Sequence, residues 1–246
     1  MMISKNRLKE LCTYKQQKHC VEAHLYVVEG PKMAHEALLT HAPIQIICAT
    51  QQWLALNASI VPSGVQSHEV TETDLARLSH ETTPNQVWML VQRPVPTEPA
   101  TEGLILALDN LQNPGNLGTI IRIADWFGIR HIVCSHDTAD CYNPKVVQAT
   151  MGAIFRTEVH YTDLPLFLSR CPLPIYGAAL DGEDIRTTTL PLYAVIVIGN
   201  ESHGINPHVA PYLTRRILIP NIGHTCESLN AAVAAGILCY EFTRQQ

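Results

Sequence analysis

The sequence predicts an α/β protein in which a small α/β domain precedes a larger domain built on a parallel sheet. Three observations lead to this prediction. Short apolar runs alternate with helical patterns in the C-terminal part of the chain. These runs are apolar at consecutive positions, as in strands that helices cover on both faces. A proline-rich segment separates this part from an N-terminal part in which strand and helix patterns also alternate.

The N-terminal part contains three helix patterns and three strand patterns. We expect helices at residues 6–17, 32–39 and 73–78, and strands at 25–28, 44–48 and 87–91. Glu29, Gly30 and Pro31 close the first strand, because glycine and proline interrupt regular structure. Strands that alternate with helices in this way predict a small α/β domain.

Residues 93–102 are expected to form an extended linker. Pro94, Pro96 and Pro99 restrict φ and remove backbone donors, and few apolar residues accompany them. The predicted domains are therefore 1–92 and 103–246, joined by this linker.

The C-terminal part contains the stronger pattern. Strands are expected at 104–108, 132–134, 175–179, 194–198 and 217–219, and helices at 117–127, 144–151, 164–169 and 228–242. Gly128 ends the first of these helices, and Ser228 is the expected N-cap of the last. In parallel α/β sheets, ligands bind at the carboxyl ends of the strands.

Composition narrows the class of protein. Apolar residues make up 46% of the chain and charged residues 16%, which is an ordinary globular balance. The longest uncharged apolar run, 231–240, is too short to span a bilayer, and charged residues interrupt the N-terminus. Eight cysteines are scattered without a CxxC pair or zinc-finger spacing. We expect a cytoplasmic protein with buried thiols, no membrane partner and no metal.

The net charge of −5 is unusual for a nucleic-acid-binding protein, because such domains are usually basic. Positive charge is nevertheless concentrated at the N-terminus, where five basic residues stand against Glu10 alone: Lys5, Arg7, Lys9, Lys15 and Lys18. This cluster is a candidate for phosphate contacts, and a solvated helix face explains it equally well.

The first candidate functional segment follows the predicted strand 104–108. A turn rich in Asn, Pro and Gly, residues 109–118, opens a helix that carries Arg122. Arg122 lies one turn beyond Gly118, so its guanidinium can lean back over the turn and offer a fork of donors to phosphate. A plain turn with a helix cap is the alternative.

The second segment ends the most hydrophobic predicted strand, 194–198, which runs directly into Gly199-Asn200-Glu201-Ser202-His203-Gly204. Glu201 is not a core residue, because carboxylates resist burial unless they are paired. The alternatives are a solvated loop for the segment and an ordinary loop residue for His203.

The third segment follows the predicted strand 217–219. It contains Pro220 and Gly223, then Ser228-Leu229-Asn230 before a helix rich in small residues. Ser and Asn beside a strand-end loop indicate binding. The chain lacks GxGxxG after the first strand, GxxxxGK[ST] and GxSxG, which argues against a dinucleotide-dependent oxidoreductase, a P-loop enzyme and a serine hydrolase.

Together the three segments resemble the motifs of the SpoU (TrmH) family of RNA ribose 2′-O-methyltransferases, in the SPOUT superfamily. The NPxNxGxxxR motif is matched by Asn113, Pro114, Asn116, Gly118 and Arg122. The GNExxG motif is matched by Gly199, Asn200, Glu201 and Gly204. The IPxxGxxxSLNxxxA motif is matched by Ile219, Pro220, Gly223, Ser228, Leu229, Asn230 and Ala234, with four residues rather than three before Ser228.

The N-terminal part carries a weaker resemblance. Val28-Glu29-Gly30 after a short strand is similar to the small ribosomal-protein-like domain that binds RNA in rRNA-modifying members. Those members usually have a basic pair before the first strand, where this chain has Lys18-His19-Cys20. The resemblance implies that residues 1–92 bind the RNA substrate.

The resemblance implies further features of the C-terminal domain. It implies a deep trefoil knot, S-adenosylmethionine bound at the knot and a homodimer formed through this domain. The implied cofactor-binding residues are Ala179, Ile198, Gly199, Asn200, Gly204, Ile219, Pro220, Ser228 and Leu229.

The resemblance implies that Arg122 acts at the ribose hydroxyl. The other catalytic candidates are Asn116, Glu201, Ser228 and Asn230. A guanidinium does not readily lose its proton. Arg122 is therefore expected to stabilise the developing alkoxide or to act with an RNA phosphate as the base. Methyl transfer from a sulfonium develops no leaving-group anion, so no metal is expected in the reaction.

Three alternatives stay open at this point. The first is a non-catalytic RNA-binding or ribosome-assembly protein with a methyltransferase fold. The second is an enzyme that methylates a base, and the third is an enzyme whose substrate is tRNA. The intact polar motif residues argue against the first. An N-terminal recognition domain without long basic tails favours rRNA over tRNA.

Overall fold

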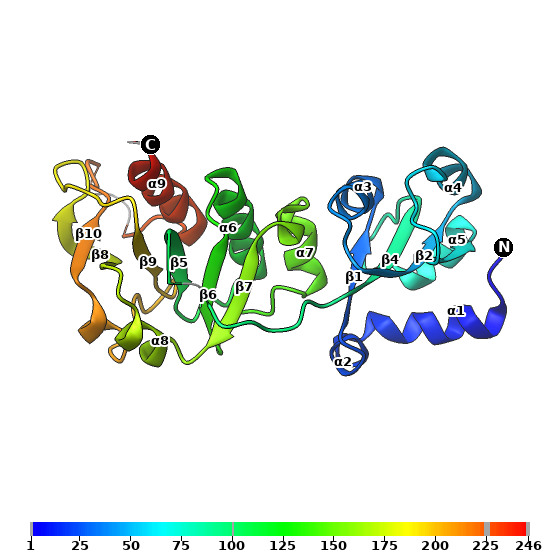
Figure 1. Cartoon of the computed structure of the whole chain (residues 1–246), viewed down its shortest axis with the longest axis horizontal. Helices are drawn as coiled ribbons and strands as arrows, with labels where there is room; N and C mark the ends of the chain where they lie inside the picture. The colour runs from blue at the N-terminus through cyan, green and yellow to red at the C-terminus, as the bar shows by residue number, and fades with distance from the viewer. Residues whose placement is uncertain (1, 100, 224–226, 245–246) are drawn as a thin grey trace. The chain divides into compact units, whose positions relative to one another are not determined.

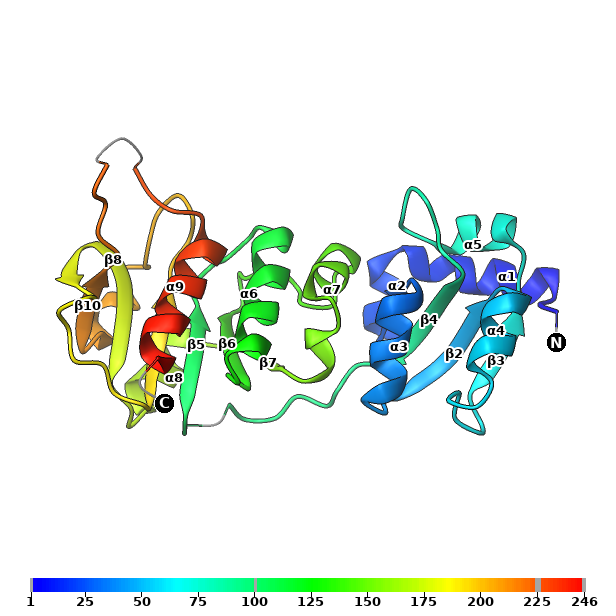
Figure 2. The same cartoon turned by 90° about the horizontal axis from the view of Figure 1, so that it is seen from above.

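The computed structural model describes residues 2–99, 101–223 and 227–244. The chain divides into two compact units, Met1–Val95 with Tyr142–Phe155 and Pro96–Cys141 with Arg156–Gln246. Figures 1 and 2 show the elements of both units, which are described separately below. No helix among the described residues is long and apolar enough to cross a membrane.

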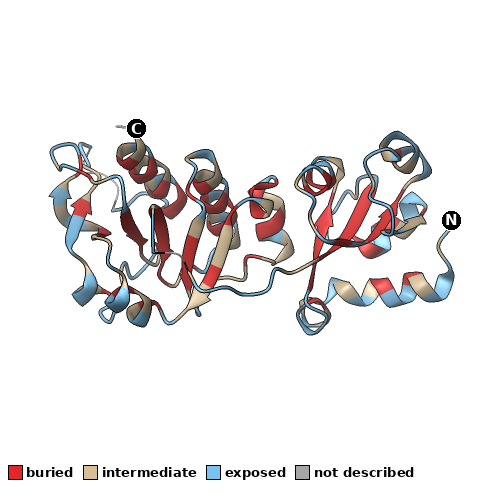
Figure 3. Cartoon of the chain, in the orientation of Figure 1, coloured by how far each residue is buried: buried red, intermediate tan, exposed pale blue. Residues whose placement is uncertain are grey.

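The N-terminal unit contains a four-stranded sheet in the order β1-β4-β2-β3. Its strands are β1 Leu25–Glu29, β2 Ile44–Ala49, β3 Gln66–Glu69 and β4 Val87–Gln92. β4 is antiparallel to β1 and β2, whereas β3 is parallel to β2. Its helices are α1 Lys5–Leu11, α2 Gln17–Glu22, α3 Pro31–Leu39, α4 Gln51–Asn57 and α5 Glu72–Leu78. Figure 3 shows β1 and β4 buried, which makes them the centre of this core.

Two of the expectations for this unit need correction. The single helix expected at 6–17 is wrong: a 3₁₀ turn, Cys12–Lys15, follows α1, and Gln16 is extended before α2. The sequence analysis also missed α4 and β3. No residue of β3 is fully buried, so its sequence lacks the apolar pattern that predicts a strand.

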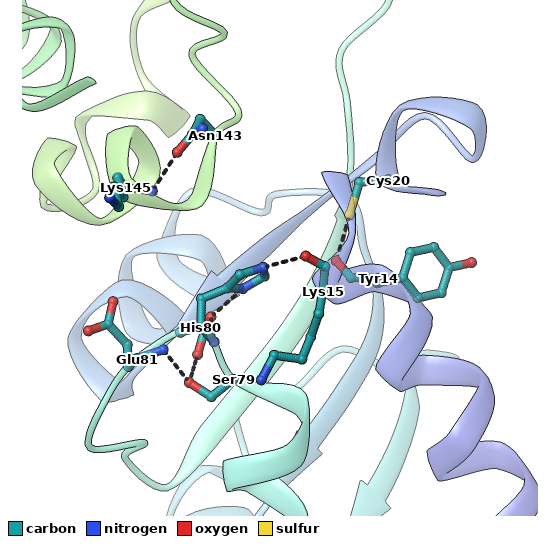
Figure 4. Close-up of polar contacts among 9 residues, drawn as sticks. Tyr14, Lys15, Cys20, Ser79, His80, Glu81, Asn143 and Lys145 are labelled. Atoms are coloured by element: carbon teal, nitrogen blue, oxygen red, sulfur yellow. Dashed lines mark hydrogen bonds and ion pairs between the residues drawn. The ribbon is translucent and has the colours of Figure 1, made fainter. Parts of the chain in front are cut away.

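A buried polar network holds the loop after α5 in this unit. Glu29, at the end of β1, is 9% exposed. Its carboxylate accepts hydrogen bonds from the Ser79 hydroxyl and from the backbone N–H of His80, the latter at 3.0 Å. His80 Nδ1 lies 3.1 Å from Glu29 Oε1, and His80 Nε2 lies 3.0 Å from the Lys15 carbonyl. Figure 4 shows the His80 ring beside Lys15 and Ser79.

We expect His80 to make the stability of the chain depend on pH. Both ring nitrogens face acceptors, so the imidazolium is favoured, and the hydrogen bond to Glu29 raises the His80 pKa from its ordinary value of 6.5. The stabilisation is complete below pH 6.5 and is lost as the pH rises through the raised pKa. Urea unfolding from pH 5.5 to 8.5 should show the difference between the wild type and His80→Gln shrinking with pH. A difference that stays constant across this range contradicts the expectation.

The C-terminal unit contains the predicted parallel sheet. Six strands run in the order β10-β8-β9-β5-β6-β7, and every neighbouring pair is parallel. The strands are β5 Leu104–Leu108, β6 His131–Ser135, β7 Glu158–Thr162, β8 Ile175–Asp184, β9 Ala194–Ile198 and β10 Arg215–Leu218. β5 and β9 are buried along their whole length, which is the pattern that predicted helices on both faces.

Helices α6 Pro114–Trp126 and α9 Ala231–Thr243 contact each other, as Figures 1 and 2 both show, and α9 also contacts β9. Helix α8 Leu164–Arg170 contributes Leu164 and Leu168 to the core, where they pack in a cluster with β5, β6 and β9. Helix α7 Pro144–Thr150 contacts β1 and belongs by its contacts to the N-terminal unit.

Some boundaries in the C-terminal part differ from those expected. The expected N-cap Ser228 is wrong, because α9 begins at Ala231 and Asn230 is its N-cap. Helix α6 begins at Pro114 rather than 117, with Asn113 as its N-cap. Strand β7 was missed, since only one of its five residues is fully buried. Five of the seven described cysteines are buried and none forms a disulfide with another described residue; Cys226 lies outside the described residues.

Candidate functional site

The first two motif segments begin at the same edge of the sheet because β5 and β9 are neighbours. Leu104 pairs with Ala194 and Leu108 with Ile198, so the two strands end at the same level. The carboxyl edge of a parallel sheet is where such folds place their ligands. Residues 109–116 and 199–204 therefore leave the sheet side by side.

The segment after β5 is organised by Asn113. Its Oδ1 accepts hydrogen bonds from the backbone N–H groups of Gly115 and Asn116, at 2.9 and 3.2 Å. Pro114 occupies the first turn of α6, where its missing donor costs nothing. The motif residues Asn113 and Pro114 thus start the helix that carries Asn116 and Arg122.

The segment after β9 folds back on itself. Backbone hydrogen bonds join Asn200 and Gly204 in both directions, at 2.9 and 3.0 Å, and Asn200 Nδ2 donates to the Asn110 carbonyl at 2.8 Å. Gly199 must lack a side chain, because a Cβ there would lie 2.3 Å from the carbonyl carbon of Gly204. Gly204 has φ +69°, a conformation that glycine adopts without strain.

A chain of side-chain hydrogen bonds joins all three motifs. Asn116 Nδ2 donates to Glu201 Oε1 at 2.9 Å, and Asn230 Nδ2 donates to Asn116 Oδ1 at 2.9 Å. The direction is consistent, since a carboxylate only accepts and therefore turns the amide nitrogen of Asn116 toward itself. Asn230 Oδ1 accepts from the backbone N–H groups of Ala232 and Val233 at the start of α9. Glu201 and Asn230 are exposed and Asn116 is half-buried, so the network lies at the surface rather than in the core.

Two hollows flank this network. The first, of about 450 Å³, is lined by polar residues of the first two motif segments: Asn110, Gln112, Asn113, Asn200, Glu201, Ser202 and His203. The second, of about 580 Å³, lies between α6 and α9 and is lined by Gly115, Asn116, Thr119, Ile123, Asn230, Ala232, Val233, Gly236, Ile237 and Tyr240. Asn116 and Asn230 belong both to the network and to the second hollow.

Arg122 is exposed on α6 and forms no ion pair or hydrogen bond with another described residue. Arg122 follows Gly118 by four residues and Thr119 by three, so the three share one face of the helix. Because helical side chains lean toward the N-terminus of the helix, that of Arg122 extends toward Gly118 and Thr119. Arg122 is the ninth of the thirteen residues of α6, and its guanidinium leaves its donors for an anionic or hydroxyl group of a ligand.

The remaining cofactor candidates lie in β8, directly after β10 and just before α9. Ala179 lies in β8, two residues beyond the pairing of Gly177 with Val197. Ile219 and Pro220 directly follow β10 and are half-buried. Ser228 is exposed, and the side chain of Leu229 is 49% exposed. None of these five lines either of the two hollows described above.

The basic cluster of the N-terminal unit is largely available to solvent. Lys5, Lys9, Lys15 and Lys18 are exposed. Two of the five basic residues have partners. The guanidinium of Arg7 pairs with Glu10 at 2.5 Å and donates to Gln66 Oε1 at 3.1 Å, and Lys18 Nζ lies 3.8 Å from Glu22 Oε1.

Asp109 is a site-building residue that the sequence analysis did not single out. It follows β5, is 3% exposed, and its Oδ2 accepts a hydrogen bond from the backbone N–H of Asn206 at 2.6 Å. Burial raises the pKa of this carboxyl. Asp109 thus ties the end of β5 to the chain just beyond the GNExxG motif. The sequence signal that could have identified Asp109 is a carboxylate directly after a fully apolar strand.

Two substitutions at Asn230 should separate its capping role from its link to Asn116. Asn230→Asp keeps an acceptor for the α9 cap but removes the donor to Asn116, whereas Asn230→Ala removes both. We expect only the alanine variant to lose about 1 kcal/mol of unfolding free energy, and both variants to lose the activity of the site. Urea unfolding and activity assays on both variants measure this. Full activity in Asn230→Asp would show that the link is dispensable.

Comparisons with known proteins identify the family of each part of the chain. Residues 103–240 match the model of the SpoU rRNA Methylase family, and residues 5–88 match the MRM3-like substrate binding domain. The chain is 28% identical over 236 residues to the Bacillus subtilis 23S rRNA (guanosine(2553)-2′-O)-methyltransferase RlmP, covering 94% of this chain and 92% of that protein.

Solved structures give the same result. A TrmH-family protein of Porphyromonas gingivalis has a TM-score of 0.92 and 38% identity, with 100% of both chains covered. An AdoMet-bound rRNA methyltransferase from Sinorhizobium meliloti has a TM-score of 0.85 and 28% identity, covering 100% of this chain and 97% of that one. The fold, the three motif segments and these matches lead to one conclusion: the chain belongs to the SpoU rRNA methylase family.

Proposed function

We propose that this protein transfers a methyl group from S-adenosylmethionine to a ribose 2′-hydroxyl of rRNA. The observation that carries the proposal is the hydrogen-bonded chain Glu201–Asn116–Asn230, which joins the three motif segments at the ligand-binding edge of the sheet. The family assignment and the name of the B. subtilis relative, a 23S rRNA 2′-O-methyltransferase, support the same reaction.

The residues present fit S-adenosylmethionine, which supplies a methyl group on a positively charged sulfur. Leu229 and Ile222, beside the strand-end loops, are 49% and 75% exposed and so offer apolar surface against which an adenine ring could pack. Ala179, Ile198, Gly199, Asn200, Gly204, Ile219, Pro220, Ser228 and Leu229 would hold the cofactor. The AdoMet-bound S. meliloti relative supports S-adenosylmethionine as the cofactor.

Arg122 would act at the ribose. A hydroxyl is a weak nucleophile, and a guanidinium next to it stabilises the alkoxide that develops as its proton leaves. Glu201, through Asn116, would hold the N-terminal turn of α6 and so the position of Arg122. Ser228 and Asn230 would orient the RNA from the third motif segment.

Each part of the chain has a role in this proposal. Residues 1–92 would bind the RNA substrate, 93–102 would link the two parts and 103–246 would carry methyl transfer. The match of residues 5–88 to a substrate binding domain supports the first of these roles. The exposed Lys5, Lys9, Lys15 and Lys18 offer phosphate contacts there, together with Arg7. We propose the cytoplasm as the place where the protein would meet an rRNA substrate.

The test uses ribosomal RNA isolated from a strain that lacks the gene. The purified chain is incubated with this RNA and methyl-labelled S-adenosylmethionine, and the product is digested to nucleosides. We expect the label in one 2′-O-methylnucleoside. Label on a base, label only in a parallel reaction with tRNA, or no transfer in the presence of bound cofactor would each overturn the proposal.

We also propose a homodimer formed through α6 and α9. The hollow between these helices is lined largely by apolar residues, and Val233 and Tyr240 are 51% and 57% exposed. Exposed apolar side chains grouped on one helical face are typical of protein interfaces. The family's trefoil knot is proposed for the same C-terminal unit.

Val233→Glu should therefore produce a monomer, because it places an unpaired charge in the interface. Sedimentation velocity measures the change. Leu166→Glu, on α8, alters a similarly exposed apolar residue, 46% exposed, outside the proposed interface and should leave the dimer intact. A wild type that sediments as a monomer contradicts this proposal.

A further inference from the structure

A cluster of His131, Glu158 and His160 lies at the edge of the C-terminal sheet opposite the candidate active site. We propose that these three side chains bind a divalent zinc-class metal ion that stabilises this edge. The proposed site is independent of the proposed reaction, because His131 and Glu158 begin β6 and β7, and His160 is the third residue of β7. The motif segments leave the sheet at the carboxyl ends of parallel strands.

Strand pairing brings the three residues together. His131 pairs with Glu158 and Val133 with His160 in the parallel register of β6 and β7. Glu158 and His160 are two residues apart and so share one face of the sheet with His131. One donor atom from each lies within 4.8 Å of the others.

Each of the two imidazoles has a ring nitrogen placed to bind a metal ion. The side chain of His160 is only 6% exposed, and its Nδ1 lies 3.1 Å from the Thr97 carbonyl. A carbonyl accepts only, so Nδ1 carries the proton and Nε2 presents its lone pair. Nε2 of His160 and Nδ1 of His131 are both buried and have no hydrogen-bond partner among the described residues. A backbone carbonyl behind the ligating histidine is the usual support of a metal site.

The donor spacing is close to that of a zinc site. Glu158 Oε2 lies 3.6 Å from His131 Nδ1 and 3.8 Å from His160 Nε2. Tetrahedral zinc holds nitrogen and oxygen ligands about 3.3–3.6 Å apart. The two imidazole nitrogens lie within 4.8 Å of each other, so the rings must move closer together to reach this spacing. Two imidazoles and one carboxylate suit zinc-class ions rather than magnesium or calcium, and the side chain of Glu158, 40% exposed, leaves room for water as the fourth ligand.

The carboxylate of Glu158 has one oxygen for the site. Its Oε1 accepts a hydrogen bond from Arg130 Nε at 3.0 Å, whereas its Oε2 faces the two histidines. A neutral imidazole is the form that binds metals. The alternative is a salt bridge between a charged His131 and Glu158, which would bind no metal ion stoichiometrically.

The test is metal binding to the full chain after treatment with a chelator. We expect one Zn²⁺ per chain by titration against a chromogenic chelator, and a higher melting temperature with Zn²⁺ than without. His131→Asn and His160→Asn should each weaken binding by at least 100-fold and abolish the thermal shift. His208→Asn, an exposed histidine elsewhere in the unit, should leave both unchanged.

Cobalt distinguishes this site from the cysteines, since thiolates also bind zinc. Co²⁺ held by nitrogen and oxygen gives visible bands without the strong near-ultraviolet absorption of sulfur ligation. Sulfur-ligated Co²⁺, binding that survives both histidine substitutions, or no stoichiometric binding each overturns the inference. Circular dichroism of the variants without metal separates lost binding from lost folding, and Glu158→Gln provides a third variant that keeps the side-chain volume.

Discussion

Arg122→Ala is expected to retain S-adenosylmethionine binding and to lose methyl transfer. Arg122 is exposed and makes no ion pair or hydrogen bond with another described residue, so its removal disturbs no contact of the fold. Removal of one group that stabilises a developing oxyanion lowers kcat by about 10²–10³-fold. Single-turnover transfer to rRNA measures the loss, and calorimetry measures cofactor binding.

Two further variants sharpen this prediction. Arg122→Lys keeps the positive charge but loses the planar fork, and should recover only part of the rate. Arg170→Ala, at the exposed end of α8, removes the same side chain away from the site and should be fully active. Near-normal turnover in Arg122→Ala removes Arg122 from the mechanism. A parallel loss in Arg170→Ala attributes the effect to overall charge.

Gly199→Ala is expected to destroy cofactor binding and to destabilise the C-terminal unit. The new Cβ would lie 2.3 Å from the Gly204 carbonyl carbon and 2.5 Å from its oxygen and from Ile205 N. All three are backbone atoms, so the segment after β9 must move. We expect a loss of about 1–3 kcal/mol in unfolding free energy, with S-adenosylmethionine affinity reduced beyond detection by calorimetry.

Gly204→Ala is the matched comparison within the same motif. Nothing lies within 4 Å of a Cβ at Gly204, so the only cost of the substitution is the backbone strain of a side chain at φ +69°. This strain is roughly 1–2 kcal/mol. We expect weakened but measurable cofactor binding in this variant. If Gly204→Ala proves more damaging than Gly199→Ala, then backbone conformation rather than the close approach controls this segment.

The acidic net charge makes the distribution of basic residues important for RNA binding. Exposed lysines gather in the first 18 residues, whereas Arg122 stands alone near the motif segments. This arrangement agrees with a division between RNA binding in the N-terminal unit and chemistry in the C-terminal unit. Phosphate contacts from the lysines would dominate affinity and make it depend on salt.

The sequence by itself determined the fold class, the order of most elements and the three motif segments. Residues 104–108 and 194–198 are apolar at every position, and the observed strands β5 and β9 have the same bounds. Such strong local patterns do not depend on distant residues. Where the apolar pattern was weak, the prediction failed. Strands β3 and β7 are only partly buried, and their polar residues interrupt the apolar pattern that predicts a strand.

Only the tertiary structure decided which side chains meet. Asn116 and Glu201 are 85 residues apart, and Asn116 and Asn230 are 114 apart, so no spacing rule joins them. The buried bond from Asp109 to Asn206 and the cluster of His131 with His160 likewise depend on strand order and register. Local propensity acts over a few residues, whereas parallel strands are paired through crossovers whose packing a single sequence pattern does not encode.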